Sequence, residues 1–302
     1  MLSTLLALIA ATASAQDATY VGAAACLTCH QAEHAVWDAT KHAQSFKSVH
    51  KNPLSKDILA AVGGGTNIRK NQTCIQCHFT IEPNAEGVQA ARSGVSCEKC
   101  HGAASKWMPI HNDYGGKNVS RAAETPEHKA NRIAAAKAAG QLRPDMKLEI
   151  AQNCASCHGL SQPGVDAETF AKMLKAGHPA VADFELVRYS QGSVRHRFYD
   201  PKVNAETPPA DLARLFVLGQ AAKLVSAAAA SAAAPDGDYK TFQAKRADDA
   251  RKALGTDGLP PEAAKLSAEP SLDNARALAA ALDGKDLSAA LKDLLPPPAS
   301  YK

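Results

Sequence analysis

The chain has 302 residues and a formal net charge of +4 with its histidines neutral. Its apolar fraction of 45% overstates the bulky side chains available for a core, because roughly a fifth of all residues are Ala and only 5% are aromatic. So small a charge, without a dense Lys/Arg block, argues against a nucleic-acid partner. The length allows one large domain or two modest ones. Eight Cys and eleven His are the features that bear on function.

The N-terminus has the layout of a secretory signal peptide over residues 1–15. Leu2 to Thr12 form a short apolar run, and Ala13-Ser14-Ala15 supplies a small-x-small cleavage site. The run is too short to span a membrane, and no basic residue follows Met1. A frayed apolar N-terminus is the alternative. We expect an exported, periplasmic protein, with the cell surface or the extracellular space as further possibilities.

A second apolar stretch runs from Leu215 to Ala234. It is mostly Ala and contains Gln220, Lys223 and Ser226, so it makes a poor transmembrane span. We therefore expect a mature protein that does not span the membrane.

Every cysteine belongs to a C-x-x-C-H motif, and this motif occurs four times. The motifs are Cys26-Leu27-Thr28-Cys29-His30, Cys74-Ile75-Gln76-Cys77-His78, Cys97-Glu98-Lys99-Cys100-His101 and Cys154-Ala155-Ser156-Cys157-His158. Two thiols at this spacing can each add to a vinyl group on one haem edge, and the following His then binds the iron. Disulfides, zinc ribbons and thioredoxin-type sites do not require a His at this offset. The sequence predicts four covalently attached haem c groups.

The other seven histidines are candidates for the second axial ligand of each iron. We expect His42, His111, His178 and His196 to serve, and His34, His50 and His128 to face solvent or pack near a haem edge. His42 lies in a predicted helix over Gln31–Phe46, about 18 Å along the axis from His30. If His42 binds an iron, it must therefore bind a haem other than the one held by His30.

Two stretches of the sequence resemble the tetrahaem cytochromes of the c-554 type, within the multihaem c-type cytochromes. They are Trp37-Asp38-Ala39-Thr40-Lys41-His42-Ala43 after the first motif, and Gly94-Val95-Ser96-Cys97-Glu98-Lys99-Cys100-His101-Gly102 with His111 shortly after. The resemblance covers roughly residues 20–180. It implies a mainly helical, loop-rich fold organised around closely packed haems.

The resemblance also implies an assignment of distal ligands. His111 would serve the first haem, His42 the third and, by preference, His178 the fourth. The second haem, on His78, is five-coordinate in the protein that names the family, and here His196 or a neighbouring subunit could fill that position. Some multihaem relatives polymerise into extracellular filaments.

We predict a tetrahaem domain over residues 16–204 and an Ala/Pro-rich helical extension over residues 205–302, which the naming protein of the family lacks. Thr207-Pro208 opens a helix with an apolar stripe, and a polar helix follows from Asp236 to Leu254, ended by Gly255. We expect a packing helix and a loosely ordered tail, with no strand-rich domain. A docking or assembly role is the alternative.

These features predict an electron carrier in a respiratory chain, with redox proteins as electron donor and acceptor, rather than an enzyme. The first alternative is an enzyme that acts on a small nitrogen or sulfur species at an open second haem. The second is self-assembly as a subunit of an extracellular cytochrome filament.

Overall fold

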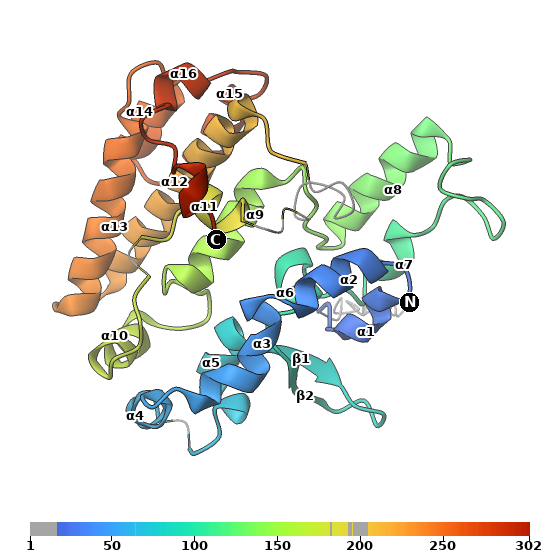
Figure 1. The fold of residues 1–302 in the computed structure, drawn as a ribbon, viewed down its shortest axis with the longest axis horizontal. Coiled ribbons are helices and arrows are strands. Elements are labelled where there is room, and N and C mark those ends of the chain that lie inside the picture. Colours follow the sequence, from blue (N-terminus) through green and yellow to red (C-terminus); the bar gives the residue numbers. More distant parts are fainter. Residues whose placement is uncertain (1–16, 64, 182, 193–194, 196–204) are drawn as a thin grey trace, which may run out of the picture.

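The computed structural model describes residues 17–63, 65–181, 183–192, 195 and 205–302. The predicted signal peptide and His196 lie outside the described residues. Helices and connecting loops make up nearly all of the described chain (Figure 1), which confirms the predicted mainly helical, loop-rich fold.

The part of the chain that carries the motifs is built from short elements. These are α1 (Ala23–Leu27), α2 (Gln31–Asp38), α3 (Lys41–Ser48), α4 (Ser55–Ala61), α5 (Gln72–His78), β1 (Thr80–Pro83), β2 (Gln89–Ser93), α6 (Cys97–His101), α7 (Met108–His111), α8 (Pro126–Ala138), α9 (Lys147–His158), α10 (Ala167–Lys175) and α11 (Leu186–Ser190). The helices of the C-terminal extension follow: α12 (Pro209–Ala233), α13 (Asp238–Leu254), α14 (Pro261–Ala268), α15 (Leu272–Ala281) and α16 (Ser288–Leu291).

The predicted single helix over Gln31–Phe46 is wrong, because the chain forms two helices there. The first, α2, ends at Asp38, and Thr40 is the N-cap of α3. The Thr40 hydroxyl accepts a hydrogen bond from the Ala43 amide at 3.2 Å and donates one to the Trp37 carbonyl at 2.7 Å. A threonine can satisfy helix-end groups in this way, so a helix boundary is favoured over continuation.

A β-hairpin, which the sequence analysis did not predict, separates the second and third motifs. Strands β1 and β2 pair antiparallel, with Ile81 opposite Ala91. Gly87 has a φ of 79° in the connecting turn, where its amide donates to the Asn84 carbonyl. Glycine suits this left-handed conformation because it lacks a Cβ atom.

The C-terminal extension is a packed helical unit, so the expected loosely ordered tail is wrong. Its apolar side chains form a continuous core between α12, α13 and the three helices that follow. Leu266, Leu278 and Leu291 are fully buried in this core. The predicted helix boundaries hold closely, since α12 begins at Pro209 and α13 ends at Leu254 before Gly255.

The helix α12 is long and apolar enough to cross a membrane by length and composition alone. Half of its most apolar window is buried against other parts of the protein. Close packing explains part of that burial. A Cβ atom on Gly219 would lie 2.8 Å from the Leu186 Cβ, so glycine lets α11 approach α12.

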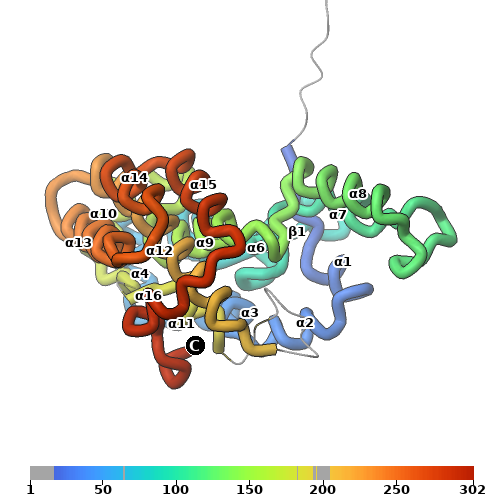
Figure 2. The backbone as a smooth tube through the Cα atoms, turned by 90° about the horizontal axis from the view of Figure 1, so that it is seen from above, coloured from blue at the N-terminus to red at the C-terminus, as the bar shows by residue number. Residues whose placement is uncertain are grey.

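One helix, α9, joins the two parts of the fold. Leu148, Ala151 and Ala155 on α9 belong to the core of the C-terminal extension, and the last residues of the same helix form the fourth motif. On the opposite side of the molecule, α7 and α8 project away from the C-terminal helices (Figures 1 and 2). The extension therefore packs directly on a helix that carries a motif.

Candidate haem sites

Each motif lies in or next to the end of a helix. The second, third and fourth motifs form the last residues of α5, α6 and α9, and the first begins inside α1. Helical spacing places positions one, four and five of such a motif on the same side of the backbone. The two thiols and the imidazole of one motif can therefore face a single bound group.

The motifs lie in two pairs, in which a thiol of one motif is adjacent to a thiol of another. Cys26 of the first motif hydrogen-bonds to Cys97 of the third, and this bond lowers the pKa of Cys26. Cys77 of the second motif hydrogen-bonds to Cys157 of the fourth, and this bond lowers the pKa of Cys157 to about 7. Groups attached at these paired motifs would lie close together.

The third motif lies between the others. The Lys99 ammonium donates to the Gln76 carbonyl of the second motif at 3.3 Å. The Lys99 carbonyl accepts from the Asn153 amide group on α9 at 2.8 Å. Burial lowers the pKa of Lys99, which lies near Cys77 and Cys157. Through this one residue the third motif contacts both members of the second pair.

A buried carboxylate fixes the third motif to the first. Glu98 is 1% exposed. Its oxygens accept hydrogen bonds from the Gly22 and Ala104 amides at 2.8 Å, and from the Val21 amide at 3.0 Å. A buried carboxylate is stable only where such donors compensate it. Glu98 therefore holds the chain just before the first motif.

Three motif histidines each have a second histidine ring nearby. Two imidazoles on opposite sides of one metal ion have nitrogens about 4 Å apart and ring centres about 6 Å apart, because each metal–nitrogen bond is about 2 Å. The ring centres are 6.4 Å apart for His30 and His111, 6.0 Å for His78 and His178, and 5.9 Å for His42 and His158. The described residues therefore have the ring spacing that a haem iron between two imidazoles requires.

Several of these rings also have the orientation of a metal ligand. The Nδ1 atoms of His111, His101 and His178 contact the carbonyls of Met108, Leu142 and Pro179 at 2.5, 2.9 and 3.0 Å. A carbonyl partner assigns the proton to Nδ1 and leaves the Nε2 lone pair for a metal.

Burial also favours the neutral form of these imidazoles. Burial lowers the pKa of His78 to about 4, with the neighbouring His178 adding to the effect. Burial likewise lowers the pKa values of His111 and His178. Neutral imidazole is the form that binds metals.

Two of these pairs differ from the assignment that the resemblance implies. His178 lies beside His78 instead of serving the fourth motif, and His42 lies beside His158 of that motif. The backbone decides this outcome. His178 lies just after α10, where its amide donates to the Met173 carbonyl at 3.0 Å, and α3 begins as a separate helix after its N-cap Thr40. The rings of His30 and His111, which the resemblance assigns to one haem, lie next to each other.

The remaining histidines lie as follows. His34 packs edge-on against Trp37 at 5.1 Å, and His50 is exposed. His128 lies in the first turn of α8, where its amide donates to the N-cap Thr125. Its imidazole contacts Glu124 at 2.8 Å. His111 lies in the one-turn helix α7.

The two sequence stretches that carried the resemblance contact each other. The Trp37 indole donates to the Val95 carbonyl at 2.8 Å, and the Val95 amide donates to the His42 carbonyl at 3.0 Å. A side chain on Gly94 would collide with the carbonyl oxygens of His42 and Ala43. The signature is therefore a structural unit that fixes His42 beside the segment leading into the third motif.

Comparison with known proteins finds similarity in the region that contains these two stretches. The model of the family described as "Cytochrome c554 and c-prime" matches residues 25–102. Cytochrome c-554 of Nitrosomonas europaea is 26% identical over 225 residues, which cover 65% of this chain and 88% of the relative. Part of this chain is therefore similar to the c-554 cytochromes. The resemblance predicted from the sequence is confirmed. No solved structure matches the chain.

A buried ion pair supports His111, and the sequence analysis did not identify it. The Arg132 guanidinium donates to the His111 carbonyl at 2.6 Å. The same guanidinium forms a bidentate pair with Glu124, whose side chain is 1% exposed. This pair lowers the pKa of Glu124 to about 2. Arg132 lies twenty-one residues beyond His111, and no local pattern marks the contact.

The fourth motif has an aromatic neighbourhood that the sequence analysis also missed. Phe184 stacks on His158 with ring centres 4.5 Å apart and planes 10° apart, and Tyr189 lies 5.8 Å from His158. Lys302 donates to the Tyr189 hydroxyl at 2.9 Å. Two features of the sequence could have marked Phe184 and Tyr189 as neighbours of a site. Aromatic residues are scarce in this chain, and both follow closely after Gly177-His178-Pro179.

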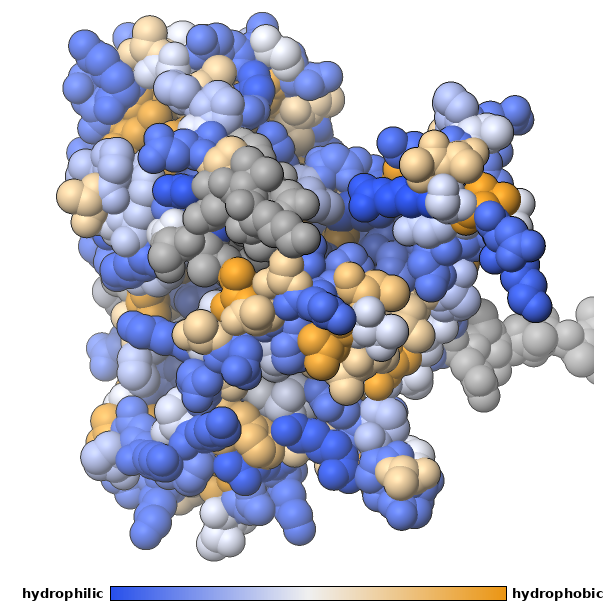
Figure 3. Space-filling view, turned by 45° about the vertical axis from the view of Figure 1, so that its right-hand side comes forward, coloured by the Kyte–Doolittle hydropathy of each residue, from blue (hydrophilic) through white to orange (hydrophobic). Residues whose placement is uncertain are grey.

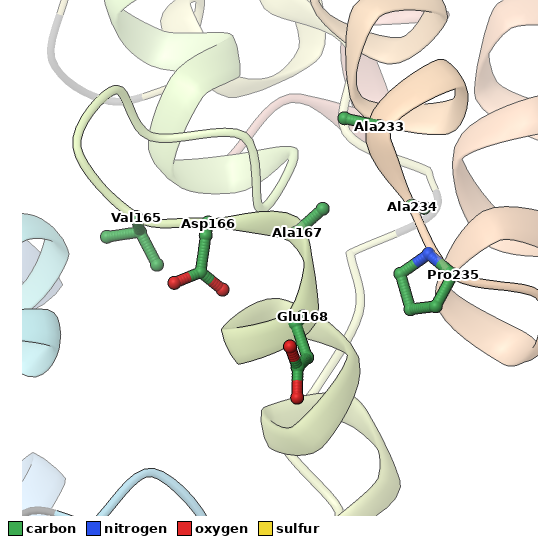
Figure 4. A pocket seen from close by; sticks show the side chains of 7 residues that line it. All are labelled: Val165, Asp166, Ala167, Glu168, Ala233, Ala234 and Pro235. Atoms are coloured by element: carbon green, nitrogen blue, oxygen red, sulfur yellow. The ribbon is translucent and has the colours of Figure 1, made fainter.

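An open pocket lies apart from the motifs. It has a volume of about 660 Å³ between the start of α10 and the end of α12, and Figure 4 shows the carboxylates of Asp166 and Glu168 on one side and Pro235 on the other. Asp166 caps α10 by accepting from the Thr169 amide at 2.6 Å. Because no motif residue lines the pocket, we assign it no role.

On the face seen in Figure 3, hydrophobic side chains form small groups among hydrophilic ones.

Proposed function

We propose that this protein is an exported multihaem c-type cytochrome that transfers electrons through four covalently attached haem c groups. The observation that carries the proposal is the set of three histidine pairs with ring centres about 6 Å apart. Each pair contains one histidine from a C-x-x-C-H motif and one from outside the motifs. The similarity to cytochrome c-554 supports the same function.

The eight motif cysteines would attach the haems through thioether bonds. His30, His78, His101 and His158 would be the proximal ligands, with His111, His178 and His42 distal on the first, second and fourth haems. His196, which lies outside the described residues, is the remaining distal candidate, and we assign it to His101 by elimination. When bound, haem iron supplies one-electron redox chemistry, and the protein sets its ligands, spacing and burial.

The protein's own contribution is to hold the motifs close together. The contacts between Cys26 and Cys97, and between Cys77 and Cys157, place the attachment edges of two haem pairs side by side. Lys99 and Asn153 join one pair to the other. Electrons could then cross the molecule through neighbouring haems, between redox proteins that act as donor and acceptor.

The second motif decides between a carrier and an enzyme. An enzyme would need an open iron position, and His78 is the proximal candidate there. The His178 ring lies 6.0 Å from the His78 ring, which is the spacing of a closed site. This contact favours the carrier over catalysis at the second haem. The export part of the proposal rests on residues 1–15, which have the layout of a signal peptide. Export also fits the proposed cofactor, because c-type haems are attached outside the cytoplasm.

The test is a haem count followed by a spin-state measurement on the purified full-length protein. Intact mass and the pyridine haemochrome spectrum should give four haems per chain. Electron paramagnetic resonance of the oxidised protein should show low-spin iron only. Fewer than four haems, or a substantial high-spin signal in the wild type, would overturn the proposal as stated.

A further inference from the structure

One face of α13 holds the backbone that directly follows the fourth motif. The Tyr239 hydroxyl donates to the Leu160 carbonyl at 2.6 Å, and the Gln243 amide donates to the Gly159 carbonyl at 2.8 Å. The Arg246 guanidinium donates to the same Gly159 carbonyl at 3.1 Å. Residues 239, 243 and 246 share one helix face because they are spaced four and three apart. The C-terminal extension thus reaches the residue next to the proposed ligand His158.

The backbone in this turn has an unusual conformation. Leu160 has a φ of 51°, and it is the one non-glycine residue with positive φ in the described ranges. A leucine in the left-handed region carries a steric cost, which surrounding contacts must offset. A side chain on Gly159 would also collide with the Arg246 guanidinium. The turn after His158 is therefore shaped by α13.

Arg246 places a buried positive charge beside this turn. The residue is 2% exposed. Its Nη1 atom donates to neutral acceptors, the Gly159 carbonyl and the Gln243 side chain, and its Nη2 atom has no hydrogen-bond partner in the described structure. Burial lowers the pKa of Arg246 to about 10, so the group stays protonated at neutral pH.

A buried charge without a carboxylate partner is costly, so its position needs a physical reason. Part of the compensation comes from the C-terminal end of α9, where the helix dipole favours a cation. That end also carries His158. The guanidinium is hydrogen-bonded to the residue that follows this ligand, within a buried region where charge interactions are weakly screened.

We propose that Arg246 is a positioning residue of the fourth haem site that also raises the reduction potential of the haem attached there. The inference rests on the proposed function, since it requires a haem on Cys154, Cys157 and His158. Reduction adds an electron to the haem, and a nearby buried cation favours the reduced state. The C-terminal extension thereby tunes one haem of the chain.

The test is a potentiometric titration of the holoprotein, followed by visible absorption. In Arg246→Gln, one of the four redox components should move to lower potential by at least a tenfold change in its redox equilibrium, which is about 59 mV for one electron. Arg246→Lys keeps the charge and should largely restore the wild-type value. All four haems should stay attached and low-spin.

Two matched controls separate charge from structure. Lys245→Gln removes the same formal charge from the neighbouring position, where the side chain is 68% exposed, and should leave every potential unchanged. Tyr239→Phe removes one hydrogen bond to the Leu160 turn but no charge, and should also leave the potentials unchanged.

Three outcomes would overturn the inference: four attached haems with unchanged potentials in Arg246→Gln, an equal shift in Lys245→Gln, or an equal shift in Tyr239→Phe. If Arg246→Gln attaches fewer haems, Arg246→Met removes the charge with a different side chain and repeats the test. A wild-type peptide mass without haem at Cys154 and Cys157 would instead refute the proposed function.

Discussion

The imidazole rings of His78 and His178 lie with their centres 6.0 Å apart, and they join the second motif to the loop that follows α10. This contact supports our proposal of a closed second site over the alternative of an open one. Substitution of His178 therefore tests which haem this residue serves.

His178→Ala should leave four haems attached and convert one of them to high spin, because it removes one axial ligand. In a Cys74→Ser/Cys77→Ser background, which lacks the second haem, the same substitution should produce no high-spin signal. Electron paramagnetic resonance measures both. A high-spin signal that persists in that background would assign His178 to another haem.

Glu98→Ala should destabilise the protein by about 2–3 kcal/mol, because it leaves the buried amides of Val21, Gly22 and Ala104 without their carboxylate acceptor. Guanidinium chloride unfolding measures the loss. Glu168→Ala is the matched control, since that side chain is 70% exposed and should change stability by less than about 0.5 kcal/mol. Equal effects at the two positions would contradict the structural role of Glu98.

Leu278→Ala should cost about 2–5 kcal/mol, because the leucine is fully buried in the core of the extension and its loss leaves a cavity. Leu272→Ala, at a position that is 38% exposed on the same helix, should cost much less. Thermal unfolding of the two variants compares them. A loosely ordered extension would instead tolerate both substitutions equally.

Glu124→Gln should lower the melting temperature at pH 7, because it breaks the ion pair between Glu124 and Arg132 that supports His111. The pair holds the pKa of Glu124 at about 2, below its ordinary value of 4.5. Its stabilisation is therefore complete above about pH 4.5 and is lost as the pH falls towards 2. Melting curves over this range should show the variant and the wild type converging at low pH. A constant difference from pH 7 to pH 2 would refute this linkage.

The sequence by itself determined the chemistry of the four motifs. Cysteine and histidine spacing is local, so the thiols and imidazole of Cys97, Cys100 and His101 share one side of a short helix whatever surrounds them. Helix signals such as Thr207-Pro208 and Gly255 were equally local, and they predicted the start of α12 and the end of α13 correctly.

Only the tertiary structure decided which histidine outside the motifs lies beside which motif histidine. His42 could not be matched to His158, or His178 to His78, from spacing alone, because each pairing depends on how distant helices pack. The same reason hid Arg132, Phe184 and Arg246, which reach their partners across 21, 26 and 87 positions of the chain. The chemistry of each motif depends on residues that are neighbours in the sequence, whereas the pairing of sites depends on long-range packing.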